Sequence, residues 1–448
     1  MHAPSSEAAV SGGRDAVTVK SALRPPTDVP GLLPVAALIV LGTAGMFFGQ
    51  PNTIAHLPWL VLLFPFCLCI MALSAPSYGS AFRRAFLLGL AGNSAGLYWL
   101  VFPMNDVAGM PLLAAAPCVA LLASYLALYA GLTAMGMRRI RLFFSGTRPI
   151  AENCHADAPP IFGAILSGLL GGMVYGGFEV LSGTLFTGFP WLSLGSAFAF
   201  RPEWVQTASI TGSYGLSAVY AAVACFAADT FLARRWKHRT ISALLALVLC
   251  ASVPAYGVYR LSASPQKSSP AGLSVILVQG NVDQNQKWVP LFQEQTLKQY
   301  MSLTTHALEE KPAERPVLVV WPETAMPFAY QLHRDYAAAL RGFAARSRIN
   351  LLFGTLGVEV PLPGTSDQFN RVYLISSAGA EAGHYDKRHL VPFGEYIPLA
   401  IQLPFLSELL QGLDFSSGRQ ALPLELPLPL EKRDPLADDP LLPTVNGQ

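Results

Sequence analysis

Two short segments in the last third of the chain carry the side chains best suited to catalysis. The first, WPETAMP, holds Glu323, and the second, YDKRHLVPFGEY, holds Lys387 and Glu395. A carboxylate and a lysine are two members of a Glu-Lys-Cys set, in which a base activates a thiol for acyl transfer. The third member does not follow them, because the sequence contains no cysteine after Cys250.

Short apolar runs alternate with amphipathic stretches after residue 263, a pattern typical of an α/β domain. We expect strands at 273–279, 317–321, 350–355 and 371–377, and helices at 289–310 and 332–347. Glu323 then lies just past the end of a buried strand, where open α/β sheets tend to place functional side chains. A lone glutamate at such a position is more often a helix cap or a solvated charge.

The segment around Lys387 does not fit a regular element. Pro392 and Gly394 exclude a regular helix or a central strand. A rigid loop with charges of both signs is a frequent place for a functional site. A solvated surface loop with a pair between Lys387 and Glu395 explains the same residue types equally well.

The first part of the chain has the composition of a membrane domain. Of the 448 residues, 52% are hydrophobic and only 13% are charged, whereas a soluble protein carries about 25% charged residues. A membrane span needs about 20 mainly apolar residues. Six more apolar runs after the first argue against a cleaved signal peptide. The candidate spans are 31–49, 57–75, 86–104, 111–136, 161–182, 210–232 and 240–258.

Lysine and arginine are distributed unevenly over the loops between these spans. They gather before the first span and after the second, fourth and sixth, and Arg201 is the exception in the alternate loops. By the positive-inside rule, the tail at 1–30 is cytoplasmic, and seven spans place the domain at 265–420 on the outer face. The net charge of +2 and the lack of a basic stripe with interleaved aromatic residues indicate no nucleic-acid partner.

The fifth span contains two further features. Gly168, Gly172 and Gly176 recur every four residues, which is typical of a helix face that packs closely on a neighbour. Glu179, near the end of the same span, is either a functional charge at membrane depth or a carboxylate at the interface.

The cysteines give little sign of a metal site. Five of the six lie in apolar runs and are interpreted as small buried side chains. Cys154 and His155 form an isolated pair, which is too few ligands for a confident metal site. We therefore expect no metal and no cofactor.

The motifs as a group resemble those of the apolipoprotein N-acyltransferase family, the membrane branch of the nitrilase (carbon-nitrogen hydrolase) superfamily. The similarity rests on WPETA and YDKRHLVPFGEYIP, with support from VQGN and QKW within 278–288 and from FPW at 189–191. It covers about residues 30 to 420. The resemblance implies a multi-span α-helical membrane domain at 31–260, followed at 265–420 by part of a nitrilase-like α/β domain, an αββα sandwich.

The resemblance also implies a reaction and a site. An acyl chain would pass from a membrane phospholipid to a cysteine as a thioester, and then to the α-amine of the diacylglyceryl-cysteine at an apolipoprotein N-terminus. Glu323 would be the general base, Lys387 would stabilise the oxyanion, and Glu395 would orient the site. Trp288 and Trp191 would bind substrate, although from the sequence alone Trp191 fits an aromatic belt at the membrane interface better. The protein would lie in the bacterial inner membrane with its α/β domain in the periplasm, in agreement with the orientation from the basic residues.

The sequence departs from the family after the Lys387 motif. The family nucleophile follows on a strand, usually in a Cys-Tyr-Glu context, whereas here residues 415–419 precede a proline-rich tail at 421–448 without a cysteine. A fragment, a frame-shifted end and a protein that has lost catalysis are the three explanations. We expect no acyl transfer from this polypeptide alone. Two other functions stay open: a membrane-tethered amidase or nitrilase that uses the same triad, and a non-catalytic membrane scaffold or transporter.

Overall fold

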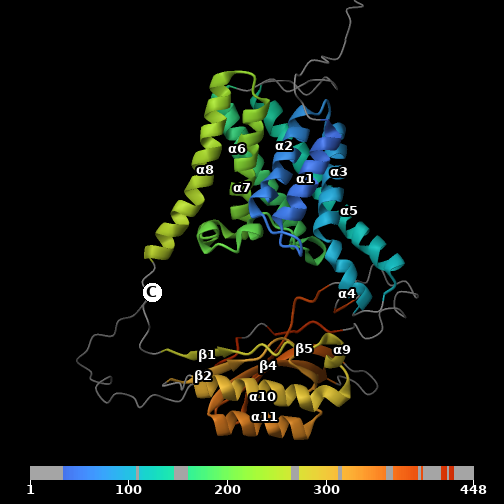
Figure 1. Ribbon diagram of the computed structural model, residues 1–448, viewed down its shortest axis with the longest axis vertical. Helices are drawn as coiled ribbons and strands as arrows, with labels where there is room; N and C mark the ends of the chain where they lie inside the picture. The colour runs from blue at the N-terminus through green and yellow to red at the C-terminus, as the bar shows by residue number, and fades with distance from the viewer. Residues whose placement is uncertain are drawn as a thin grey trace, which may run out of the picture.

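The computed structural model describes residues 34–106, 110–145, 160–263, 272–310, 315–359, 367–391, 395–396, 415–420 and 423–427. Within these ranges the chain forms a helical bundle followed by a sheet domain with helices (Figure 1). The prediction of a helical membrane part followed by an α/β part is confirmed.

The bundle is made of apolar helices, and 3-10 turns occur in several of the connections between them. Helices α5 to α8 are each long and apolar enough to cross a membrane. Helices α3 and α4 reach the same criterion only as a pair bent by 51°, and α1 and the segment Pro58–Ser74 are shorter. The seven-span topology therefore stays a prediction. The helices are α1 Val35–Gly49, α2 Leu63–Ser74, α3 Tyr78–Gly96, α4 Val101–Asp106, α5 Leu112–Phe144, α6 Ile161–Ser182, α7 Ala208–Leu232 and α8 Trp236–Ala263.

Helices α6 and α7 pack through small residues, as the glycine spacing predicted. A Cβ atom at Gly176 would lie 2.8 Å from the Cβ of Ala218, and one at Gly172 would meet the Ala218 carbonyl. A Cβ atom at Gly168 would overlap the ring of Phe226. The absence of side chains on this face of α6 therefore permits the close approach of α7.

A buried ion pair joins three helices of the bundle. The guanidinium Nη1 of Arg141 on α5 lies 2.7 Å from Asp229 Oδ1 on α7, and both side chains are almost fully buried. Ser242 on α8 donates a hydrogen bond of 2.8 Å to the other carboxylate oxygen. Two opposite charges are thus neutralised where the surroundings are apolar, which is the condition for keeping them buried.

The described residues of the sheet domain form six strands, in the order β1-β2-β4-β5-β6 with β3 also paired to β4. Strands β1, β2 and β4 are parallel, and β4, β5 and β6 are antiparallel. The strands are β1 Ser274–Leu277, β2 Val317–Val320, β3 Met326–Ala329, β4 Ile349–Glu359, β5 Asp367–Ile375 and β6 Glu381–Asp386. The helices are α9 Gln284–Lys287, α10 Gln293–Glu310 and α11 Arg334–Ser347.

Helices α10 and α11 cover one face of this sheet (Figure 1). Alternate residues of β2 and β4 point into the core beneath them, including Val319, Leu351 and Phe353. Leu340 and Phe343 of α11 complete that core. The period of two in a strand directs the intervening residues to the opposite face, where the candidate site lies.

The predicted strands and helices of this domain are present with shifted ends, and the short helix α9 and two strands were not predicted. Strand β4 extends to Glu359, beyond the predicted end at 355, and β5 begins at Asp367 rather than 371. The sequence analysis missed β3 and β6. Strand β3 is four residues long and contains Pro327, and β6 carries polar residues and Gly383, so neither has the apolar pattern that marks a strand.

Candidate active site

Glu323 lies in a tight turn between β2 and β3, both of which pair with β4. Strand β2 pairs with residues 349–352 of β4, and β3 pairs with Thr355 and Leu356. The turn lies beside Gly354 of β4, between the residues that pair with β2 and those that pair with β3. The Gly354 N–H donates a hydrogen bond of 3.3 Å to the carbonyl of Pro322. Thr324 adopts a φ of 48°, which is uncommon for a residue with a branched side chain. The position of Glu323 is therefore fixed by backbone contacts with β4.

Gly354 is the residue on which this turn depends. A Cβ atom there would lie 2.8 Å from Glu323 Cα and would also meet the backbone nitrogen of Thr324. We expect Gly354→Ala to cost about 1–3 kcal/mol of stability, because inserted atoms overpack a rigid contact. Denaturant unfolding of the purified protein measures this. Gly342→Ala is the matched control, since its Cβ would meet only the mobile end of Arg346, and an equal loss in both variants would refute the proposed contact.

Lys387 reaches the same place from the other side of β4. It directly follows β6, and its N–H donates a hydrogen bond of 2.9 Å to the carbonyl of Asn370 on β5. Its Nζ lies 3.1 Å from Glu323 Oε1 and 2.9 Å from Glu395 Oε1. The structure thus brings together the three residues that the sequence analysis assigned to catalysis, and Lys387 bridges the two carboxylates.

Asn370 makes a second bridge between the two carboxylates. Its Nδ2 donates to Glu323 Oε1 and, at 2.9 Å, to Glu395 Oε1. Each of these oxygens therefore accepts from one ammonium and one amide. The sequence analysis missed Asn370, because the expected strand began one residue later and an asparagine at a strand end carries no distinctive signal.

The two carboxylates differ in how firmly they are held. The Glu395 side chain is 13% exposed, whereas that of Glu323 is 62% exposed. Glu395 Oε2 also accepts a 2.8 Å hydrogen bond from the N–H of Val391, and the Glu395 N–H donates to the Val391 carbonyl. Glu395 is suited to hold Lys387, and Glu323 is free to meet a reactant.

The contacts also determine the charges. Burial alone would raise the pKa of Glu395, but hydrogen bonds from Lys387, the Val391 N–H and Asn370 prevail and lower it. Burial alone would lower the pKa of Lys387, but its hydrogen bonds to Glu395 and Glu323 prevail and raise it. The shifts therefore favour an ammonium on Lys387 and a carboxylate on Glu395 at neutral pH.

These pKa shifts predict a pH dependence. The lowered pKa of Glu395 adds stability that is present above its ordinary value of 4.5 and is lost as pH falls through the folded pKa. The raised pKa of Lys387 adds stability that is present below 10.5 and is lost as pH rises through the folded pKa. We expect the acetylation of Lys387, followed by mass spectrometry against pH, to have a midpoint above 10.5. Glu395→Gln should move that midpoint down, and an unchanged midpoint would contradict this interpretation.

A later segment of the chain packs against the turn that carries Lys387. Phe415 and Gly418 donate backbone hydrogen bonds of 2.9 Å to the carbonyls of Glu395 and Lys387. A Cβ atom at Gly418 would overlap the carbonyl of Asp386. The segment at 415–418 therefore fixes the backbone on both sides of the site.

The two tryptophans predicted to bind substrate lie in different parts of the chain. Trp288 follows α9 and is about half exposed, and Trp191 lies in the connection after α6 with its ring 5.9 Å from that of Phe189. Among the described contacts, neither touches the three candidate catalytic residues, so their role stays a prediction. The neighbouring Lys287 has its pKa lowered by burial, and attraction by Glu323 partly opposes this shift.

The described part of the sheet domain contains no cysteine. The cysteines that the structure describes, Cys67, Cys69, Cys118, Cys225 and Cys250, all lie in helices of the bundle. The site consequently has a candidate base and a candidate cation, and these residues supply it with no thiol.

Two family profiles match the chain. That of the apolipoprotein N-acyltransferase N-terminal domain matches residues 42–226, and that of carbon-nitrogen hydrolase matches residues 276–408. The apolipoprotein N-acyltransferase of Geobacter metallireducens is 34% identical over 384 residues, which are 84% of this chain and 67% of that protein. The chain belongs to the apolipoprotein N-acyltransferase family. Its members are acyltransferases with a carbon-nitrogen hydrolase domain, and the membrane helices identify this chain as a membrane protein.

Other apolipoprotein N-acyltransferases show the same extent of similarity. The Methylococcus capsulatus protein is 31% identical over 81% of this chain and 65% of its own length, and the Ralstonia nicotianae protein is 29% identical over 89% and 70%. The chain spans about two thirds of the length of these relatives. A carbon-nitrogen hydrolase from Helicobacter pylori is 17% identical over 27% of this chain and 40% of its own, with a TM-score of 0.20, and adds nothing to the assignment.

Proposed function

We propose that this chain provides the base and the oxyanion-stabilising cation of an apolipoprotein N-acyltransferase site. The observation that carries the proposal is the position of Lys387 Nζ between Glu323 and Glu395. An accessible carboxylate next to a fixed ammonium is suited to acyl transfer, which needs proton transfer and stabilisation of a negative oxygen. The family membership supports acylation of a lipoprotein as the reaction.

The proposed reaction has two steps that use the same residues. Glu323 takes the proton of a cysteine thiol, and the thiolate attacks the ester carbonyl of a phospholipid. Lys387 has three N–H donors, of which two bond Glu323 and Glu395, so the third can stabilise the oxyanion. The intermediate collapses to the thioester, and Glu323 returns its proton to the leaving alcohol.

In the second step the α-amine of the apolipoprotein N-terminus attacks the thioester. Glu323 accepts the amine proton and passes it to the departing thiolate, which leaves an amide and restores the thiol. Glu395 keeps Lys387 charged in both steps. A phospholipid donor favours a bacterial inner-membrane protein whose sheet domain lies on the periplasmic side, in agreement with the basic loops.

A chimaera tests the proposal. Residues 1–420 of this chain are joined to the segment of the Geobacter metallireducens relative that follows its equivalent of position 420. The chimaera and the unmodified chain are each incubated with phospholipid vesicles and a diacylglyceryl lipopeptide. We expect mass spectrometry to detect an added acyl group on the lipopeptide with the chimaera and none with the unmodified chain.

Two outcomes would refute the proposal. One is a folded chimaera without activity, when the intact relative is active under the same conditions. The other is acyl transfer by the unmodified chain, because that would require a nucleophile other than the one assumed.

A further inference from the structure

A buried ionic network lies directly behind Asn370 and Lys387. In the β5–β6 pair Arg371 is the register partner of Asp386. The next pair toward the site is Asn370 and Lys387, joined by the backbone hydrogen bond from Lys387 N–H. Because consecutive side chains of a strand point to opposite faces, the first pair lies behind the sheet and the second lies in the site.

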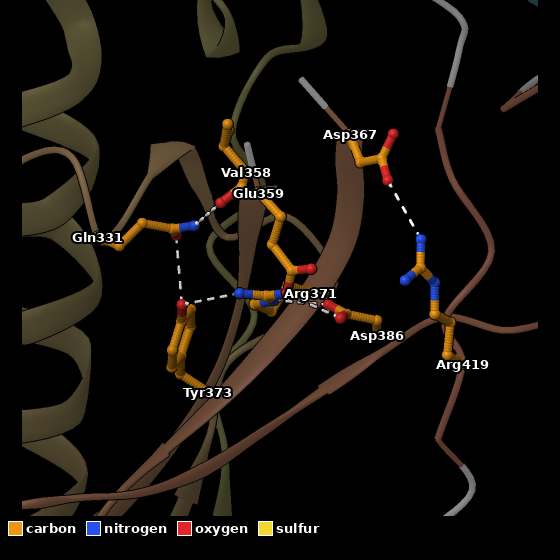
Figure 2. A network of polar contacts seen from close by, with 8 residues as sticks. All are labelled: Gln331, Val358, Glu359, Asp367, Arg371, Tyr373, Asp386 and Arg419. Atoms are coloured by element: carbon orange, nitrogen blue, oxygen red, sulfur yellow. Dashed lines mark hydrogen bonds and ion pairs between the residues drawn. The ribbon is translucent and has the colours of Figure 1, made fainter. Parts of the chain in front are cut away.

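Arg371 is the centre of this network (Figure 2). Its Nε and Nη2 donate to the two carboxylate oxygens of Asp386 at 2.6 and 2.8 Å, and Nη2 also donates to Glu359 Oε1 at 2.8 Å. Its Nη1 donates to the hydroxyl of Tyr373 at 3.3 Å, which in turn donates to Gln331. The Arg371 side chain is only 4% exposed. A forked guanidinium held on both sides fixes its partners in direction as well as distance.

The fold makes room for this arginine. A Cβ atom at Gly357 on β4 would lie 2.6 Å from Arg371 Nε. The Arg371 guanidinium also neutralises Glu359 and Asp386, which together with His384 place three potential ligand atoms within 4.8 Å of one another. Two of these three groups are thus already bonded to a cation of the chain itself, so the cluster is an ionic link between strands.

Strand β6 needs such a link. It is the last strand in the sheet order within the described residues, so it pairs on one side only. Its register with β5 shifts between Leu374 and Ile375, at the end away from the site. A strand that slips by one residue turns its side chains to the opposite face, which would remove Lys387 from both carboxylates.

We propose that the Arg371–Asp386 ion pair is a positioning device that holds β6 in register, so that Lys387 and Asn370 both reach Glu323 and Glu395. The inference rests on the proposed function for the role of Lys387. Neither Arg371 nor Asp386 is assigned contact with substrate. Both residues act by setting the position of Lys387 and the contacts of its ammonium.

The reactivity of Lys387 tests this in the full chain without any acyl transfer. The protein is treated with limiting acetic anhydride at pH 9, and the labelling of Lys387 is measured by mass spectrometry relative to the exposed Lys298. Arg371→Lys and Asp386→Asn each disrupt the paired hydrogen bonds between the guanidinium and the carboxylate. We expect about tenfold faster labelling of Lys387 in both, which corresponds to a fall of one pKa unit as the carboxylate contacts are lost. Glu359→Gln is the control, since Glu359 is half exposed and its contact with Arg371 does not involve β6.

Unchanged Lys387 labelling in folded Arg371→Lys and Asp386→Asn proteins would overturn the proposal, as would an equal change in Glu359→Gln. If the Arg371→Lys and Asp386→Asn proteins do not fold, the proposal is tested by amide hydrogen exchange in the unmodified protein. The Lys387 amide is expected to be as well protected as those at the centre of β5, and rapid exchange there would overturn the proposal. Failure of the chimaera to transfer acyl groups would leave these results unaffected.

Discussion

Lys387→Met in the chimaera is expected to lower acyl transfer by about 10²–10³-fold, the usual cost of removing one donor to an oxyanion. Methionine keeps an unbranched stem as far as Cε, with sulfur in place of Cδ, and removes the ammonium. The rate of acyl release from the phospholipid should fall along with the overall rate, because both tetrahedral intermediates use the same cation. The release of lysophospholipid and the acylation of the lipopeptide, each followed by mass spectrometry, measure the two steps.

The control for this loss is a variant of a lysine outside the site. Lys298 on α10 pairs with Glu294 on the surface, and both side chains are largely exposed. Lys298→Met should retain full activity, because an exposed pair of this kind contributes little. Lys387→Arg restores the charge but not the reach of Nζ to two oxygens, so it should recover activity only in part. Full activity of the Lys387→Met variant would show that Lys387 has no role in the reaction.

Arg141→Leu is expected to destabilise the bundle by about 3–5 kcal/mol, because it leaves Asp229 as a buried charge without its partner. The ion pair is 2.7 Å long, and its two side chains are 8% and 7% exposed. Among the contacts of the described residues, the hydroxyl of Ser242 would remain to stabilise the carboxylate. Thermal unfolding in detergent, followed by a thiol-reactive dye on the buried cysteines, measures the loss.

The double variant Arg141→Leu, Asp229→Leu separates charge from packing. It removes both ions, so it should recover most of the stability that the single variant loses. If the double variant is as unstable as Arg141→Leu, the cost comes from packing of the arginine and not from an unpaired carboxylate. Equal stability of Arg141→Leu and the unmodified protein would show that Asp229 has another partner.

The fold was accessible from the sequence where burial leaves a periodic pattern. Six of the seven apolar runs coincide with helices of the bundle, whereas the run at 86–104 crosses the bend between α3 and α4. Strands β1, β2, β4 and β5 were predicted within a few residues, although β1 is only partly buried. Strands β3 and β6 were not, because Met326–Ala329 is short and Glu381–Asp386 is polar. Strand β6 is in contact with Arg371 and pairs with β5. Neither contact produces a periodic pattern of residues in the sequence.

The site was predicted only in part for the same reason. Glu323, Lys387 and Glu395 lie in motifs that a family resemblance can identify. Asn370 enters the site through β5, and its contacts with both carboxylates depend on the register of three strands. Gly354 matters because the turn at Glu323 approaches its backbone. Such contacts between distant segments follow from tertiary packing and leave no local signal.

The most direct test of the proposed site is whether the chimaera forms an acyl-enzyme that depends on Glu323. The chimaera and its Glu323→Gln variant are incubated with phospholipid in the absence of a lipopeptide, and the intact mass of each is measured before and after treatment with hydroxylamine. We expect the chimaera to gain the mass of one acyl chain, which hydroxylamine removes as it does from a thioester, and the Glu323→Gln variant to gain none. Acylation of the Glu323→Gln variant at the rate of the unmodified chimaera would contradict the assignment of Glu323 as the base.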